Sequence, residues 1–86
     1  MKLTFSREAW DHYIYWQEND RATVRKIGKL IEECMRHPFE GTGKPEPLKG
    51  DFAGYWSRRI DREHRLVYRV TDIAIEIALC RFHYAG

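Results

Sequence analysis

The spacing of apolar residues changes once along this chain, and the change limits the folds that are open to it. Up to residue 36, apolar side chains recur every three or four positions, which is the period of an α-helix. From residue 55 onward they alternate with polar ones, as in a half-buried β-strand. Between the two parts, residues 37–47 read HPFEGTGKPEP, and three prolines with two glycines predict a loop. Helices first and strands afterwards are typical of an α+β fold.

Two helices are predicted in the first part, and each has sequence signals at its ends. The first follows Ser6, a good N-cap, and runs to about Glu18. Asp20 can cap the second helix, which we expect over Arg21–Arg36. This helix ends there because proline disfavours helical backbone at the preceding residue, here His37. The expected core stripes are Trp10, Tyr13 and Ile14, with Trp16 beside them, and then Val24, Ile27, Leu30, Ile31, Cys34 and Met35.

Three strands are predicted after the loop, at Tyr55–Ile60, Arg65–Val70 and Ile73–Cys80. Their connections are short enough for an antiparallel meander. We expect Lys2–Phe5 to pair with this meander and Leu48-Lys49 to add a short strand. The predicted fold is therefore α+β, with two N-terminal helices packed on one face of a twisted antiparallel sheet, and the other face is expected to carry arginines.

Length and composition predict a single globular domain over residues 1–86. The chain is 43% hydrophobic and 33% charged, a balance typical of folded proteins rather than disordered ones. Its longest apolar run begins at Ile73, is broken by Glu76, and is too short to cross a bilayer. An acidic residue, Glu8, precedes any apolar segment that could serve as a signal peptide. We expect a soluble, cytoplasmic protein with no membrane partner.

Cysteine and histidine spacing gives no sign of a metal site. Cys34 and Cys80 stand far apart in apolar stretches, so we expect two free, buried thiols rather than a disulfide. His12, His37 and His64 lack the spacing of metal ligands and are expected to be non-catalytic. We expect no cofactor.

The net charge of +2 comes from the second half of the chain, where eight basic residues face six acidic ones and six of the eight are arginines. The planar guanidinium group suits phosphate and stays charged when partly buried. The alternative is an ordinary sheet surface on which these arginines pair with nearby carboxylates. The six arginines are Arg58, Arg59, Arg62, Arg65, Arg69 and Arg81.

Five residues could together act on a phosphodiester, a reaction that needs a base, an acid and fixed positive charge. Glu46 lies between two prolines that stiffen its backbone, and it could be the base. Arg59 and Arg65 flank a predicted turn and can converge on a phosphate if they share a sheet face. His83 could be the acid, and Tyr84 could stack on a nucleobase. Taken singly, each residue also has a simpler reading, as an exposed or paired surface group or, for Tyr84, as packing at the sheet edge.

Five stretches, in order and spread over nearly the whole chain, resemble the YoeB branch of the RelE/ParE-like toxins. They are Tyr13-x-Tyr15-Trp16-Gln17, then Pro38-Phe39-Glu40-Gly41-x-Gly43-Lys44-Pro45-Glu46-Pro47-Leu48, Gly54-x-Trp56-Ser57-Arg58-Arg59-Ile60, Glu63-His64-Arg65-Leu66-Val67-Tyr68 and Cys80-Arg81-x-His83-Tyr84. The resemblance implies the toxin of a type II toxin–antitoxin pair, with a fold similar to small microbial ribonucleases. It also implies a ribosome-dependent, metal-independent mRNA endonuclease that leaves a 2′,3′-cyclic phosphate.

The resemblance assigns expected roles to individual residues. Glu46 would be the general base on the 2′-hydroxyl, and His83 would be the general acid for the 5′-oxygen. Arg59 and Arg65 would hold the phosphate, with Arg65 closest to the scissile group. Tyr84 would orient the substrate. Weaker assignments make Lys49 and Glu63 contacts to the ribosome or the nucleotide.

The same resemblance implies the partners. They are mRNA in the A site of the 70S ribosome and a YefM-like antitoxin whose C-terminal segment orders on binding. A homodimer is compatible with the extra aromatic residues, and operator DNA would be reached only through the antitoxin complex. Two alternatives stay open at this point: a non-catalytic basic module that binds RNA or the antitoxin, and a ParE-like toxin directed at gyrase.

Strand parity makes one further prediction about His83. If the last strand ran on regularly, His83 would share a face with Ile75, Ile77 and Leu79, which look like core. We therefore expect a strand end or a bulge between Cys80 and His83 that turns His83 into the cleft.

Overall fold

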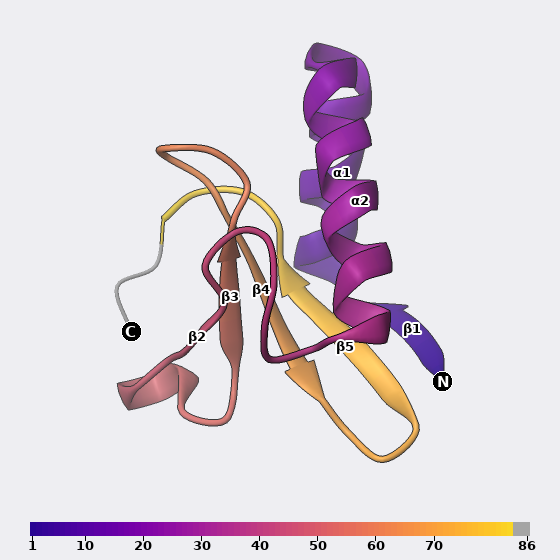
Figure 1. Cartoon of the computed structure of the whole chain (residues 1–86). Helices are drawn as coiled ribbons and strands as arrows, with labels where there is room; N and C mark the ends of the chain where they lie inside the picture. The colour runs from indigo at the N-terminus through magenta and orange to yellow at the C-terminus, as the bar shows by residue number, and fades with distance from the viewer. Residues whose placement is uncertain (84–86) are drawn as a thin grey trace.

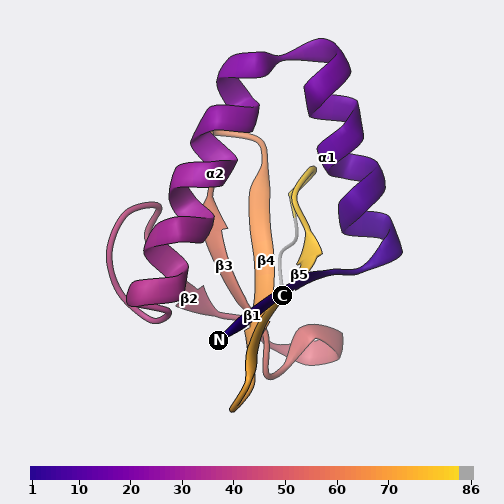
Figure 2. The ribbon, with the colours of Figure 1, turned by 90° about the vertical axis from the view of Figure 1, so that its right-hand side faces the viewer.

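Two α-helices pack against one face of a five-stranded sheet in the computed structural model, which describes residues 1–83 (Figure 1). Figure 2, seen from the helix side, shows α1 and α2 lying in front of the strands. The order is β1 (Lys2–Phe5), α1 (Arg7–Asn19), α2 (Arg21–Arg36), β2 (Glu46–Pro47), the 3-10 helix η1 (Gly50–Phe52), β3 (Trp56–Arg59), β4 (Arg65–Val70) and β5 (Ala74–Leu79). The predicted α+β class is confirmed.

The sheet is mixed, which corrects the expectation of a wholly antiparallel one. Its strand order is β1-β5-β4-β3-β2, and the meander from β3 to β5 is antiparallel as predicted. The edge strand β1 pairs with β5 in parallel, and the long connection that parallel strands need contains both helices and the other three strands. The short strand beside β3 is Glu46–Pro47, so the expectation of a strand at Leu48-Lys49 was wrong by two residues.

Side-chain caps explain where the helices begin and end. The Ser6 hydroxyl accepts a hydrogen bond from the amide of Ala9 at 3.0 Å and donates to the carbonyl of Ala78 on β5 at 2.8 Å. Asp20 ends α1 through its own amide, which donates to Trp16, and it caps α2 through its carboxylate, which accepts from Thr23. One residue therefore makes the tight corner between the helices.

The main core lies between the helices and the sheet. The predicted stripe of α2 is confirmed, with Ile27, Leu30, Ile31 and Cys34 buried. In α1 the buried residues are Ala9, His12 and Trp16, so the stripe predicted through Trp10 and Ile14 was wrong. Trp10 is 45% exposed and instead packs on Phe5 and Tyr13 at the sheet edge. The helix turns this aromatic group outward because His12 and Trp16 bond to the end of β5.

The opposite sheet face, which we call the open face, carries a smaller apolar cluster. Its buried members are Leu48, Val67 and Leu79, with Phe52 and Tyr55 packed against them. The helix-side neighbours on β4 are Leu66 and Tyr68, both fully buried. The predicted alternation of β4 is therefore confirmed.

A bulge in β5 changes which face each later residue occupies. Val67 pairs with Leu79 but Tyr68 pairs with Ile77, so Ala78 is the extra residue on the bulged strand, β5. Ile75 and Ile77 belong to the helix-side core, whereas Leu79 belongs to the open face. β5 then ends at Leu79, and Phe82 has a φ of 72°. The predicted strand end before His83 is confirmed, but the change of face begins earlier than expected.

The cysteines and the length of the helices were also predicted from the sequence. Cys34 and Cys80 are free and buried, as predicted, and burial raises the pKa of the Cys80 thiol to about 12. Within residues 1–83, no helix combines the length and the apolar character that a bilayer crossing needs.

Candidate functional site

The residues predicted to hold and cleave a phosphodiester come together at one end of the open face. Glu46 on β2 lies opposite Ser57 on β3, which lies opposite Val67 on β4. Residues paired across adjacent strands point their side chains to the same side of the sheet. Val67 belongs to the open-face cluster, so Glu46 and Ser57 also face away from the helices. The predicted base therefore lies on the open face.

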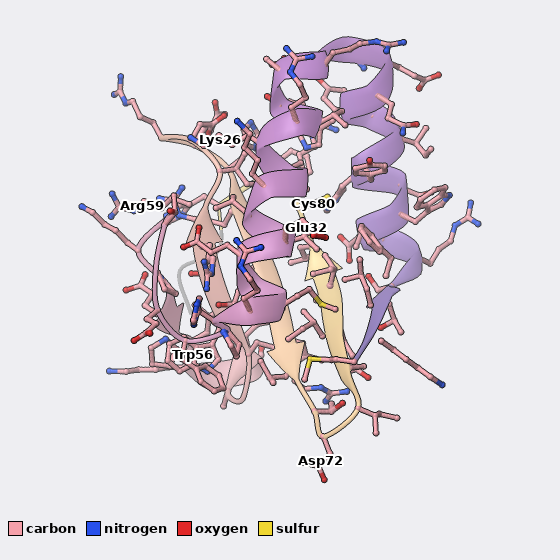
Figure 3. The ribbon with its side chains drawn as sticks, turned by 45° about the vertical axis from the view of Figure 1, so that its right-hand side comes forward. Lys26, Glu32, Trp56, Arg59, Asp72 and Cys80 are labelled. Carbon is pink, nitrogen blue, oxygen red and sulfur yellow. The ribbon has the colours of Figure 1, made fainter. Side chains whose placement is uncertain are left out.

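Arg59 and Arg65 form the next row toward the β3–β4 turn. They are paired directly across β3 and β4, two residues along from Ser57 and Val67, so they share the open face with Glu46. Figure 3 shows Arg59 on the side of the sheet away from the helices. Two like charges directly opposite each other repel, and an anion between them would relieve that repulsion. The pair is thus a candidate phosphate clamp.

The Arg65 side chain makes hydrogen bonds to the turn that precedes it. Only 9% of Arg65 is exposed, and its Nη1 donates to the carbonyls of Asp61 and His64 at 2.9 and 3.0 Å. The Asp61 carboxylate in turn accepts the amides of Glu63 and His64. Because both bonds from the guanidinium use the same nitrogen, the group is anchored at one corner. Arg59, by contrast, is exposed.

A buried arginine, one of the six in the second half of the chain, holds the loop before Glu46. Arg58 is fully buried, next to Tyr68 on the helix side of the sheet. Its guanidinium donates to the carbonyls of Thr42, His37 and Glu40, and it pairs with Glu33 at 3.7 Å. A single cation therefore satisfies the carbonyls of a loop that has no regular structure of its own.

The same loop approaches β3 too closely for a side chain at Gly43. Its carbonyl accepts the amide of Arg59 at 2.7 Å, and its φ is 87°. A Cβ there would lie 3.1 Å from the Arg59 carbonyl oxygen and from the Arg58 Cβ. Glycine is thus required where the chain passes over β3 on its way to Glu46.

His83 lies beside the β3–β4 turn and is exposed. It lines a surface hollow together with Asp61, Arg62 and Glu63. Figure 1 shows the chain beyond β5 passing to the side of the sheet away from the helices. The amide of Arg65 donates to the carbonyl of Phe82 at 2.9 Å, which ties the residue before His83 to the predicted phosphate clamp. The fold therefore brings the predicted acid to the turn that precedes Arg65.

The remaining predicted site residues are more scattered. Lys49 is exposed at the start of η1, at the far end of β2 from the turn. Glu63 is exposed in the turn itself and helps line the hollow that contains His83. Tyr84 lies outside the described residues. Within residues 1–83, no group of three or more potential metal-ligating side chains is found.

Two of the other arginines are engaged elsewhere. Arg69 pairs with Glu76 at 2.6 Å and lies over the Tyr55 ring, which is the ordinary surface pairing considered from the sequence. The Arg81 guanidinium lies 3.4 Å from the centre of the Tyr15 ring on α1. The arginines at the β3–β4 turn and on the adjoining end of the open face are accordingly Arg59, Arg62 and Arg65.

Comparison with known proteins places this arrangement in a family. Residues 5–84 match the family described as YoeB-like toxin of bacterial type II toxin-antitoxin system. The toxin YoeB of Escherichia coli K12 is 61% identical over 84 residues, covering 98% of this chain and 100% of that protein. The YoeB/ParE toxin from Agrobacterium tumefaciens is 56% identical with a TM-score of 0.95, covering 98% of this chain and 100% of that one.

A Staphylococcus aureus relative is known in two assemblies. It forms a YoeB dimer in one structure, with a TM-score of 0.91, and a heterotetrameric YoeB–YefM toxin–antitoxin complex in another, with a TM-score of 0.89. In both comparisons the identity is 49%, and 98% of each chain is covered. Both the family match and these identities extend over almost the full length, so the chain belongs to the YoeB-like toxins of bacterial type II toxin–antitoxin systems.

Proposed function

We propose that this toxin is a ribosome-dependent endoribonuclease that cleaves mRNA within the A-site codon and so stops translation. The observation that carries the proposal is the convergence of three kinds of group at one end of the open face. A carboxylate on β2, two arginines paired across β3 and β4, and a histidine beside their turn supply a base, an anion clamp and an acid. Membership of a toxin family supports a role in inhibiting growth.

In the proposed reaction, Glu46 removes the proton from a ribose 2′-hydroxyl, and that oxygen attacks the adjacent phosphorus. Arg59 and Arg65 hold the non-bridging oxygens as their negative charge increases. His83 donates a proton to the departing 5′-oxygen. The P–O5′ bond breaks, leaving a 2′,3′-cyclic phosphate on one fragment and a 5′-hydroxyl on the other. Tyr84 would orient the nucleotide, with Lys49 and Glu63 as outer contacts to RNA or ribosome. The scheme uses side chains alone, without a metal ion.

Sheet geometry supports this division of roles. Directly opposed residues have Cβ atoms about 5 Å apart, and diagonal neighbours lie about 7–8 Å apart. Arg59 and Arg65 are directly opposed, and Glu46 is a diagonal neighbour of Arg59 across β2 and β3. A phosphate between the arginines therefore lies within reach of a carboxylate on one side. His83 would approach from the hollow that it lines beside the β3–β4 turn.

We also propose two protein partners by likeness to the Staphylococcus aureus relative, which forms a dimer and a complex with YefM. They are a second copy of this chain and a YefM-like antitoxin.

The test is cleavage of a defined mRNA on programmed ribosomes by purified toxin free of antitoxin. We expect cuts within the A-site codon that depend on the ribosome. Glu46→Gln and His83→Gln should each slow cleavage at least about 10²-fold, because each removes a proton-transfer group while keeping a similar shape. The matched controls are Glu32→Gln and His37→Gln, which alter exposed side chains remote from the site and should leave the rate unchanged.

The same experiment distinguishes the alternatives. Intact RNA with folded protein would refute the nuclease and favour a basic module that only binds. Cleavage that survives Glu46→Gln and His83→Gln would leave the nuclease standing but refute the assigned base and acid. A gyrase-directed role would leave both residues without a task, so loss of toxicity in these two variants would contradict it.

A further inference from the structure

Three residues, Cys80–Phe82, connect β5 to His83, and we call them the hook. The hook forms no regular strand, yet its main chain is held by side chains. The Cys80 amide donates to Nδ1 of His12 at 3.2 Å. The Trp16 indole N–H donates to the Cys80 carbonyl at 2.8 Å. Two residues one turn apart on α1 therefore fix the start of the hook.

The end of the hook is held by two adjacent residues of the β3–β4 turn and β4. The Phe82 amide donates to Nδ1 of His64 at 2.7 Å. The Phe82 carbonyl accepts the amide of Arg65 at 2.9 Å. Both polar main-chain groups of the residue before His83 are thus bound. With a φ of 72°, Phe82 has a conformation that non-glycine residues rarely adopt, and such a conformation persists only where its surroundings impose it.

The His64 ring is itself held in place by aromatic contacts. It lies edge-on to Trp16, with ring centres 4.9 Å apart, and its centre is 6.2 Å from that of Phe82. The Phe82 ring also contacts His12, with ring centres 5.6 Å apart. Helix, turn and hook therefore interlock through rings as well as through hydrogen bonds.

The direction of the Phe82–His64 bond defines the state of the imidazole. An amide can donate to Nδ1 only if that nitrogen has a free lone pair, so the ring proton is on Nε2. Nε2 lies 3.9 Å from the carboxylate of Glu63 in the same turn. His64 is thus the acceptor in this site and is not a proton donor toward the hook.

We infer that His64 is a positioning residue for His83: by accepting the Phe82 amide, it fixes the main chain that holds His83 beside the β3–β4 turn. The inference rests on the proposed function, in which His83 is the acid. It assigns a task to a histidine whose sequence spacing suggests none. His64 binds the amide of Phe82 and Arg65 binds its carbonyl. Any shift of the hook therefore also moves His83 relative to the phosphate clamp.

The test compares His64→Leu with His64→Asn in the ribosome assay. Leucine removes the acceptor, whereas the Asn side-chain oxygen can occupy the place of Nδ1. We expect kcat to fall about 10²-fold in His64→Leu with little change in KM, because a misplaced acid slows chemistry and not binding. His64→Asn should recover much of that loss. His37→Leu, at an exposed histidine remote from the hook, is the matched control.

A double variant separates positioning from a general loss of structure. His64→Leu combined with His83→Gln should cleave no more slowly than His83→Gln alone, because the position of residue 83 no longer affects the rate once the acid is removed. A further drop in the double variant would overturn the positioning role. So would wild-type kcat in His64→Leu. If wild-type toxin itself cuts no RNA, the proposed function fails first, and this inference fails with it.

A nuclear magnetic resonance measurement keeps the inference testable even if His64→Leu does not fold. In the wild-type protein, the ¹⁵N shifts of His64 should report an unprotonated Nδ1, and the Phe82 amide should be protected from hydrogen exchange. In His64→Asn that amide should stay protected. A protonated Nδ1, or an unprotected Phe82 amide in the wild-type protein, would overturn the inference.

Discussion

Two histidines of this toxin use a ring nitrogen to bind the main chain. His12 accepts the Cys80 amide and His64 accepts the Phe82 amide, and both need an unprotonated Nδ1. The pKa of His12 lies below its ordinary value of 6.5, chiefly because the ring is buried. The positive charge of Arg81 also lowers this pKa, while Glu8 and Asp11 oppose the shift. The fold therefore favours the neutral ring.

This lowered pKa predicts a pH dependence of stability. Below pH 6.5 the unfolded chain binds a proton at His12 that the folded chain resists, so the free energy of unfolding should fall as the pH drops. The contribution is present above that pH and is lost as the pH falls toward the folded pKa. His12→Asn keeps an acceptor but cannot titrate, so its denaturant midpoint should depend less on pH. Equal slopes for the two proteins over this range would contradict the assignment.

Among the elements, the loop before β2 is held in place by hydrogen bonds from side chains of the neighbouring strands. Arg58 on β3 binds three carbonyls of the loop, and the Tyr68 hydroxyl donates to a fourth, that of Pro38, at 2.6 Å. Burial raises the pKa of Tyr68 to about 12, so this hydroxyl keeps its proton and remains a donor. The position of Glu46 on the open face thus depends on Arg58 and Tyr68, whose side chains lie on the helix side of the sheet.

Replacing Arg58 should therefore cost far more than replacing a surface arginine. Arg58→Met leaves buried carbonyls without donors and the Glu33 carboxylate without its partner, so we expect a loss of about 3–5 kcal/mol in the free energy of unfolding. Arg69→Met removes an exposed pair with Glu76 and a contact with the Tyr55 ring, and it should cost far less. Urea unfolding of both variants measures the difference. Similar losses would show that the buried network contributes little.

The elements themselves were largely predictable from the sequence, because their signals are local. Caps at Ser6 and Asp20, the proline after His37 and the alternation along β4 each act within a few residues. The bulge at Ala78 was not predictable, since the run from Ala74 to Cys80 keeps a regular apolar pattern through it. The parallel pairing of β1 was missed for a related reason: it depends on where the helices return the chain.

The candidate site shows the same division between local and distant causes. Residue type and spacing suffice to nominate Glu46, Arg59 and Arg65, and the sheet register bears out that they share a face. Strand parity puts Arg58 on the face opposite to Arg59, but its burial depends on carbonyls of a loop that is distant in the sequence. The contact of His64 with Phe82 spans 18 positions and could not be read from either segment alone.

In the molecule as a whole, most of the residues that stabilise the fold and the residues proposed for catalysis lie on opposite faces of the sheet. The helices and the larger core lie on one side of the sheet, whereas Glu46, Arg59 and Arg65 lie on the other. The hook links the two sides, since it is bound by α1 at its start and by the turn next to Arg65 at its end. Changes in the helix layer can therefore reach the proposed acid by way of this segment.

The proposed reaction begins with attack of the mRNA 2′-hydroxyl on the adjacent phosphate, so it cannot proceed without that hydroxyl. This requirement can be measured with two programmed ribosome complexes that differ only in one 2′-deoxynucleotide, placed at the nucleotide whose 2′-oxygen would attack. We expect the all-ribose mRNA to be cut to a fragment ending in a 2′,3′-cyclic phosphate, and the deoxy-substituted mRNA to stay intact at that position. Cleavage of the deoxy-substituted bond at the same rate would refute attack by the 2′-hydroxyl.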